Sequence, residues 1–150
     1  MLAKGLFFEE FQTGTVYRTD RRTITEADHV NFTTSFGFYE PLFMDQTYVE
    51  KETPYKKRLV PGALTFSIAE GLTILSGILH KTGMAFLGVD LEVHNPVFIG
   101  DSLTVDIVVA AKRESKKADR GIVTFTHQVK NQDGDVVMDY RVKRMIRRRG

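Results

Sequence analysis

A long apolar segment near the middle of the chain sets the tightest limit on the fold. Between residues 62 and 79 large apolar side chains recur every three or four positions, which places them on one face of a helix. Threonine, serine and Glu70 interrupt the segment, so it is a poor candidate for a membrane span. A helix that is apolar over so much of its circumference must be enclosed by the rest of the fold. The apolar stripe consists of Leu64, Ile68, Leu72, Leu75 and Leu79, widened by Phe66 and Ile78.

Strand-like segments follow this helix and can enclose it. Gln132-Asp133-Gly134 predicts a hairpin turn between the last two of them. His127 is in phase with the apolar residues of its segment, so we expect it to face the core. The pattern predicts an α+β fold in which an antiparallel, curved sheet wraps a long central helix at about residues 62–79. The alternating segments are 84–98, 103–109, 121–130 and 136–145.

The first half of the chain carries signals for the ends of helices. Residues 15–23 suit a polar strand, and Thr25 is placed to cap a helix that runs to about residue 35. Gly37 ends that helix, and Asp45 is expected to cap a further short helix over residues 46–52. We therefore expect short, capped helices between this strand and the long apolar helix.

Composition limits the class of protein. The chain has 150 residues, 42% of them hydrophobic, which suits one domain, residues 1–150, with its own core. With 21 basic and 19 acidic residues, the net charge of +2 favours neither nucleic acid nor a membrane surface as a partner. The basic residues between 141 and 149 are expected to be solvated, although they would also suit contact with phosphate. Because cysteine and an apolar N-terminal secretion signal are both lacking, we expect a cytoplasmic location.

Motifs for several kinds of catalytic site are missing. The four histidines, His29, His80, His94 and His127, do not occur at metal-ligand spacing, so no metal site is expected. No serine lies in a GxSxG nucleophile elbow, and the sequence has no glycine-rich phosphate loop. The sequence therefore predicts neither an α/β-hydrolase nucleophile nor a nucleotide site.

The loop between Gly37 and Asp45 reads Gly-Phe-Tyr-Glu-Pro-Leu-Phe-Met-Asp. Together with segments 22–32, 60–65 and 95–103, it resembles the MaoC-like family of (R)-specific enoyl-CoA hydratases and dehydratases. The family's loop runs Gly, Asp, aromatic, Asn, Pro, Leu, His, any residue, Asp. The resemblance covers nearly the whole chain and implies a hotdog fold, in which an antiparallel sheet wraps a central helix.

Two phenylalanines stand where this family has its catalytic pair. By the resemblance, Phe38 takes the place of the catalytic Asp, Phe43 that of the catalytic His, and Glu40 that of the Asn. Adding water to an enoyl thioester needs one group that takes a proton from water and one that delivers a proton to carbon, and a phenyl ring does neither. The family also holds the thioester oxygen on a backbone N–H at the start of the central helix, and Gly62 occupies that place here. The resemblance thus implies a chain that can polarise a thioester but lacks the usual proton-transfer groups.

The aromatic residues of the loop allow two interpretations. Phe38, Tyr39 and Phe43 can pack the loop onto its helix, in the space that polar groups and a water would otherwise fill. They can also line an acyl tunnel as substrate-binding residues.

Two carboxylates are candidates for a replacement acid. Glu40 lies in the same loop, and Glu70 projects from the apolar helix, where hotdog acyl-CoA thioesterases carry an acid. Both acids can instead be surface residues without a catalytic role. Glu40 can pair with a basic residue among 56–58, and Glu70 can lie at the solvent edge of its helix.

We therefore expect a MaoC-like protein that binds an acyl thioester of CoA or acyl carrier protein and is impaired in hydration or dependent on a partner chain. The alternatives are an acyl-CoA thioesterase that uses Glu40 or Glu70, and a non-catalytic structural or interaction subunit. The thioester is the substrate or ligand, and no cofactor is expected. An open sheet edge, and the pairing of relatives that the resemblance implies, predict a homodimer or a heterodimer with another hotdog chain.

Overall fold

The computed structural model describes residues 5–150. The first four residues of the N-terminal segment, in which the sequence predicts no secretion signal, lie outside the described residues. Six antiparallel strands form the sheet, in the order β1-β4-β5-β6-β3, with β2 also paired to β4. The strands are β1 (Val16–Arg18), β2 (Arg22–Thr23), β3 (Gly83–Val93), β4 (Ser102–Glu114), β5 (Arg120–Lys130) and β6 (Val136–Arg147). The helices are the short η1 (Phe8–Glu10), α1 (Glu26–Phe36), α2 (Pro41–Met44), α3 (Gln46–Glu52) and α4 (Gly62–Leu75).

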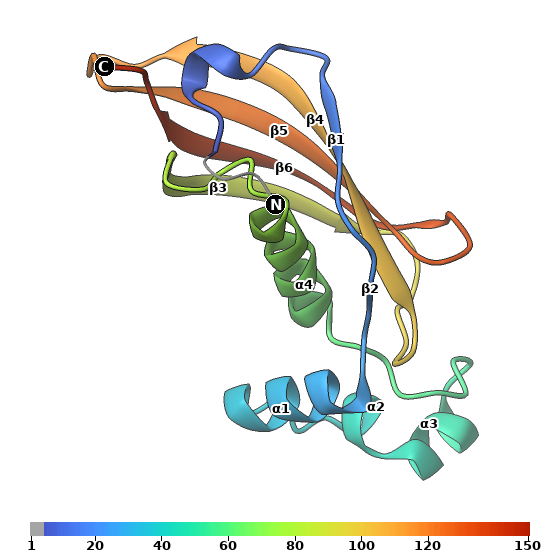
Figure 1. Ribbon diagram of the computed structural model, residues 1–150. Coiled ribbons are helices and arrows are strands. Elements are labelled where there is room, and N and C mark those ends of the chain that lie inside the picture. The colour runs from blue at the N-terminus through green and yellow to red at the C-terminus, as the bar shows by residue number, and fades with distance from the viewer. Residues whose placement is uncertain (1–4) are drawn as a thin grey trace.

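The sheet curves over α4, and α1, α2 and α3 lie together beyond the N-terminal end of that helix (Figure 1). This arrangement confirms the α+β hotdog architecture expected from the sequence. The expected strands after the helix are all present, and the turn at residues 131–135 joins β5 to β6 as predicted.

The core lies between the inner face of the sheet and α4. Leu64, Ile68 and Leu72 are buried on the helix, against alternate residues of the strands. Each such side chain contributes about 1.5–3 kcal/mol when it leaves water. The alternate residues buried on the sheet include Leu103, Val105, Ile107, Val109, Val123, Phe125, His127, Val129, Met138, Tyr140, Val142 and Ile146.

The central helix is shorter than the pattern predicted. It ends at Leu75 rather than near residue 79, because Gly77 adopts a left-handed conformation (φ 86°) that turns the chain away. Leu75 is consequently half exposed, whereas Ile78 is buried from the turn that follows the helix. Among residues 5–150, no helix combines the length and apolarity needed to cross a membrane.

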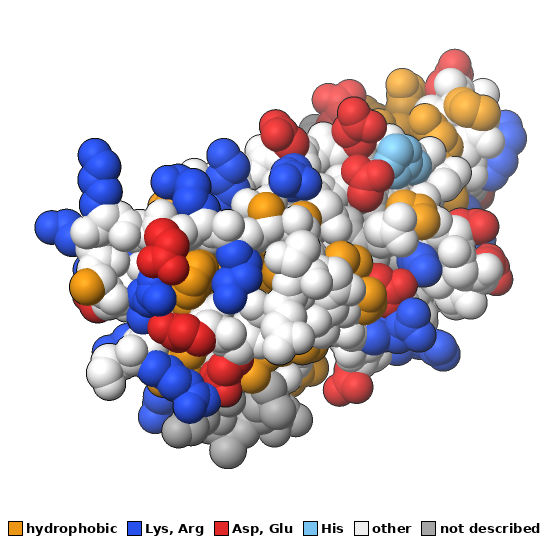
Figure 2. Space-filling model, turned by 90° about the horizontal axis from the view of Figure 1, so that it is seen from above, with side chains coloured by type: hydrophobic (Ala, Val, Ile, Leu, Met, Phe, Trp, Pro, Cys, Tyr) orange, Lys and Arg blue, Asp and Glu red, His pale blue; other side chains and the backbone are white. Residues whose placement is uncertain are grey.

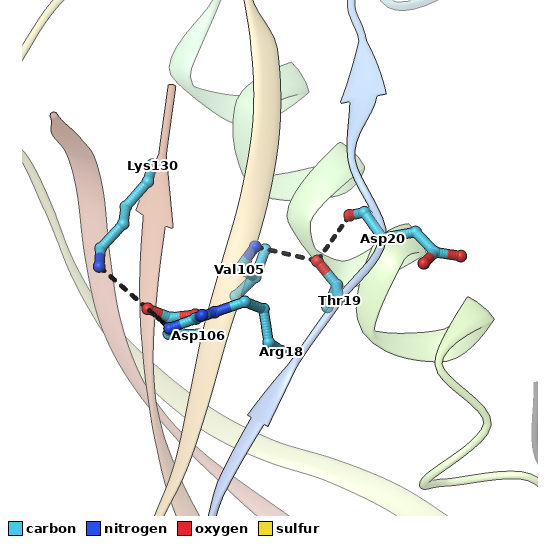
Figure 3. Close-up of polar contacts among 6 residues, drawn as sticks. All are labelled: Arg18, Thr19, Asp20, Val105, Asp106 and Lys130. Atoms are coloured by element: carbon cyan, nitrogen blue, oxygen red, sulfur yellow. Dashed lines mark hydrogen bonds and ion pairs between the residues drawn. The ribbon is translucent and has the colours of Figure 1, made fainter. Parts of the chain in front are cut away.

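A polar cluster on β4 ties the N-terminal strands to the sheet (Figure 3). Asp106 accepts hydrogen bonds from Arg18 Nε at 2.7 Å and from Lys130 Nζ at 3.0 Å. The hydrogen bond from Arg18, helped by Lys130, holds the pKa of the Asp106 carboxyl below its usual range despite partial burial. Between β1 and β2, Thr19 bridges to β4, since its Oγ1 accepts from the Val105 N–H at 2.9 Å.

Candidate functional site

The loop between α1 and α3 is fixed by helix ends. Thr25 caps α1 reciprocally with Asp28, and Gly37 ends that helix at a φ of 75°. Pro41 begins α2, and Asp45 caps α3 by accepting from the Tyr48 N–H at 3.0 Å. These caps confirm the boundaries expected from the sequence and hold the loop in one conformation.

The phenyl rings of the loop pack against one another and against α1. The Phe38 ring centroid lies 5.1 Å from that of Phe32 and 6.2 Å from that of Phe43. Buried His29 of α1 holds the Phe43 backbone, with Nε2 at 2.7 Å from the carbonyl oxygen. A carbonyl only accepts, so Nε2 carries the hydrogen. This contact is not predictable from the sequence pattern, because His29 and Phe43 belong to different elements.

A cavity of about 410 Å³ lies at the N-terminal end of α4. Its walls come from five parts of the chain: the loop, the segment between α3 and α4, the start of α4, the end of β3 with the turn after it, and β6. Most of the lining is apolar, which suits a hydrocarbon chain. The lining residues are Leu42, Phe43, Tyr55, Leu59, Val60, Gly62, Thr65, Val93, His94, Asn95, Pro96, Val97, Val137 and Met138.

Two of the residues predicted from the sequence meet in this cavity. Gly62 is the first residue of α4, so its N–H has no carbonyl one turn earlier in the helix and can meet a ligand. Phe43 is another residue of the lining. Phe38 is not a lining residue, and Tyr39 is exposed, with its hydroxyl donating to the Thr34 carbonyl at 3.0 Å.

The two candidate acids lie elsewhere. Glu40 is exposed at the start of α2, outside the cavity lining, and Arg58, a possible partner for it, pairs with Glu26 instead. Glu70 lies eight residues after Gly62, about 12 Å further along the helix axis. Neither acid belongs to the lining of the cavity that contains Gly62.

Glu70 belongs to a polar cluster inside the fold. Its Oε2 accepts from Arg144 Nη2 at 2.6 Å and from the Tyr140 hydroxyl at 2.8 Å. Burial, reinforced by the negative charge of Glu70, raises the pKa of Tyr140 well above its ordinary value, so the hydroxyl stays protonated and donates. Burial, with the positive charge of Arg144, lowers the pKa of His127 to about 3. His127 is therefore neutral, and its 4.0 Å approach to Glu70 is not an ion pair.

A group of possible metal ligands lies where β3 pairs with β6. On the face of the molecule drawn in Figure 2, acidic side chains gather beside a histidine. Glu92 is near the end of β3 and His94 follows that strand directly, while Asp139 of β6 faces Glu92 across the ladder. One ligand atom from each lies within 4.8 Å of the others, and His94 Nε2 is 2.7 Å from Asp139. Oxygen and imidazole ligands of this kind suit a divalent cation. Histidine spacing alone did not indicate the group, because strand pairing assembles it.

Comparisons with known proteins agree with this fold. The family described as "MaoC like domain" matches residues 9–131. The chain is 35% identical to Protein MaoC of Klebsiella aerogenes over 115 residues, which are 76% of this chain and 33% of that protein. It is 33% identical to the (R)-specific enoyl-CoA hydratase of Aeromonas caviae over 96 residues, 64% of this chain and 66% of the hydratase. The chain thus spans a third to two thirds of the length of these relatives. A crystal structure described as a monoamine oxidase regulatory protein, from an Archaeoglobus species, superposes with a TM-score of 0.90 at 31% identity, covering 100% of this chain and 99% of that one.

Proposed function

The chain belongs to the MaoC-like dehydratase family, and from this we propose that it binds acyl thioesters in the cavity at the start of α4 while hydrating or dehydrating them poorly on its own. The thioester, of CoA or of acyl carrier protein, is the ligand, and the proposed activity uses no cofactor.

The observation that carries this proposal is that Gly62, the first residue of α4, lines a mostly apolar cavity. A thioester oxygen at this point would accept from the Gly62 N–H and meet the partial positive charge of the helix N-terminus. A Cβ at position 62 would lie 3.8 Å from the Val93 Cγ2, an ordinary van der Waals distance, so the space here does not by itself require glycine. The acyl chain would then extend along the apolar lining.

Impaired turnover follows from the groups at positions 38 and 43. Hydration adds the water oxygen to the β carbon and a proton to the α carbon, so a base must take one proton and an acid must supply one. Each such group contributes about 10²–10⁴-fold to the rate. Phe43 lines the cavity, the Phe38 ring lies 6.2 Å from the Phe43 ring, and neither side chain exchanges a proton.

The thioesterase alternative needs an acid near the bound carbonyl. Glu70 is held by Arg144 and Tyr140, and Glu40 lies outside the lining. These contacts favour thioester binding over hydrolysis within one chain. Any role of these acids would require a second subunit to bring them to the cavity.

We also propose that the chain pairs through β3. Among the described residues this strand has only β6 as a neighbour, so its other edge presents unpaired backbone groups. Apolar side chains are exposed along the edge, including Phe86, Leu87, Val89 and Val93. Exposed Ile74 of α4 lines a hollow beside the same strand. A second hotdog chain, identical or different, would cover this surface.

Calorimetry and a hydration assay test the proposal together. The wild-type chain should bind butyryl-CoA, which has no double bond, but hydrate crotonyl-CoA slowly. The Phe38→Asp/Phe43→His variant should raise the hydration rate by about 100-fold or more, because it restores both proton-transfer groups. Comparing the stability of Phe43→His with that of the double variant shows how much the Asp at half-buried position 38 destabilises the fold. Phe36→His, which changes an exposed aromatic residue of α1, is the matched control.

Each part of the proposal has its own contrary result. Absence of butyryl-CoA binding to the folded wild-type chain would refute thioester recognition. Rapid hydration by the wild-type chain would refute impairment. Hydrolysis of the thioester that disappears in Glu40→Gln or Glu70→Gln would support the thioesterase instead.

A further inference from the structure

Two carboxylates and an imidazole meet where β3 pairs with β6. Glu92, His94 and Asp139 each offer one ligand atom, and these atoms all lie within 4.8 Å of one another. Divalent transition-metal ions bind oxygen and imidazole ligands of this kind. The proposed thioester binding gives none of the three side chains a role, so the cluster is open to a function of its own.

Strand pairing fixes the positions of the three side chains. Glu92 and Asp139 are partners in the ladder, and the His94 N–H continues the pairing by donating to the Val137 carbonyl at 2.9 Å. Side chains two residues apart on an extended chain point to the same side, so Glu92 and His94 share a face. Asp139 alternates with buried neighbours on β6 and therefore points away from the core. The two strands thus present the three groups to solvent side by side.

The two carboxylates face each other with little positive charge between them. Like charges directly opposite each other in a ladder destabilise a sheet. Within residues 5–150, Glu92 has no hydrogen bond or ion pair from its side chain, and the Asp139 carboxylate pairs with His94, whose Nε2 lies 2.7 Å away. The next basic residue of β6, Arg141, lies opposite Asp90 in the ladder. A divalent cation would supply the charge that Glu92 and Asp139 lack.

The distances between the ligand atoms are close to those of a metal site. Zinc binds imidazole nitrogen and carboxylate oxygen at about 2.0–2.2 Å, so two ligands of a tetrahedral ion lie about 3.4 Å apart. His94 and Asp139, now 2.7 Å apart, would separate slightly, and the widest pair would close from at most 4.8 Å. Glu92 is exposed and unpaired in the described part of the chain, so its side chain can rotate to make this change. Three protein ligands would leave a fourth position for water, as in open zinc sites.

We propose that Glu92, His94 and Asp139 bind one divalent transition-metal ion of the zinc type per chain. The imidazole distinguishes this class from Mg²⁺ and Ca²⁺, which prefer oxygen ligands. The proposal does not depend on thioester binding, which uses no metal. His94 and residues 95–97, which follow β3, belong to the cavity lining. The ion would therefore anchor one wall of the cavity to β6.

The test titrates the metal-free, tag-free full chain with zinc chloride by calorimetry. The wild type should bind one Zn²⁺ per chain. His94→Ala, Glu92→Gln and Asp139→Asn should each weaken binding by about 10-fold or more, because even groups that only orient a metal ligand contribute 10- to 100-fold. His80→Ala, which removes another exposed histidine outside the cluster, is the matched control and should bind as the wild type does.

Thermal unfolding gives a second readout. Zn²⁺ at about 100 times its Kd should raise the melting temperature of the wild type by about 5–10 °C and leave that of His94→Ala unchanged at the same concentration. Without metal, the melting temperatures of the two proteins should agree within about 2 °C, because the exposed pair of His94 and Asp139 contributes little to stability. This agreement shows that a loss of zinc binding is not a loss of folding.

Several results would overturn the proposal. Absence of zinc binding to the wild type would do so, as would binding that is unchanged in His94→Ala and Glu92→Gln. Equal affinity for Ca²⁺ would remove the role of the imidazole. A stoichiometry of one ion per two chains, or an equal loss of affinity in His80→Ala, would place the ion outside this cluster. No acyl ligand is present in the assay, so none of these results bears on the proposed function.

Discussion

Replacing Glu70 by glutamine tests whether this acid supports the fold or the chemistry. In the wild type, Oε2 of Glu70 receives hydrogen bonds from both Arg144 and Tyr140. The Arg144 side chain is only 8% exposed, so removal of the carboxylate charge leaves a guanidinium largely buried without an ionic partner. We therefore expect Glu70→Gln to destabilise the protein.

The size of the loss follows from the burial of the pair. Breaking a fully buried ion pair by removing one partner costs about 3–5 kcal/mol. The Glu70 side chain keeps 17% exposure, and a glutamine oxygen can still accept from Tyr140, so we expect about 2–3 kcal/mol. For a chain of 150 residues each kcal/mol corresponds to about 2–4 °C, which gives a fall in melting temperature of about 4–12 °C.

A double-mutant cycle measures this coupling. Glu70→Gln, Arg144→Met and the double variant are unfolded thermally and with urea at one protein concentration, because pairing of chains would shift the midpoint. The double variant should lose much less than the sum of the two single losses. The reasoning is refuted if Glu70→Gln costs under about 1 kcal/mol and its effect adds to that of Arg144→Met. Tyr140→Phe, which removes only a hydroxyl, is the milder control.

Three further outcomes test other parts of the structure. Asp106→Asn should lower the free energy of unfolding by about 1–2 kcal/mol at pH 7. The pKa of Asp106 is lower in the folded than in the unfolded protein. The stabilisation by its carboxylate is therefore complete above the unfolded pKa, about 4, and is lost as the pH falls through the folded pKa. In that acidic range, urea unfolding should show no difference in stability between Asp106→Asn and the wild type. Gly121→Val should lower the free energy of unfolding by about 1–3 kcal/mol in the same measurement, because a Cβ there would overlap the buried Phe8 ring. Gly134→Val is the control: open space surrounds that position, so its loss of stability reports only the strain of the left-handed backbone. Leu87→Lys on the open edge of β3 should yield a monomer by light scattering, and an unchanged mass would contradict pairing through that edge.

Local signals in the sequence predicted local structure well. Thr25, Gly37 and Asp45 each act within a few residues of their own position, and each ends or begins a helix as expected. Alternating strands were also predictable, because a sheet with one buried face imposes a period of two. The end of α4 was not predictable from the sequence, because Gly77 lies inside the apolar pattern and only its left-handed conformation ends the helix.

Contacts between distant segments were the part that the sequence could not supply. Glu70 was expected at an exposed edge of its helix or as an acid facing a substrate, and the basic run near the C-terminus was expected in solvent. The structure instead buries Arg144 of that run against Glu70, 74 residues away. In hindsight, the alternation of β6 places Arg144 inward with Val142 and Ile146, so strand phase was the available signal.

Under the proposed function, the site is divided between two parts of the chain, so that turnover and binding would depend on different residues. Gly62 and Thr65 are held by α4 and its packing against the sheet, whereas positions 38 and 43 belong to the helical loop beyond the end of that helix (Figure 1). Under the proposed function, phenylalanine at positions 38 and 43 leaves the cavity-lining residues of α4 in place, and the Phe38 ring is in tilted contact with the Phe32 ring, 5.1 Å between centroids. On this reasoning the loop can lose its proton-transfer groups without unfolding the binding cavity, and restoring them at positions 38 and 43 should change turnover far more than affinity.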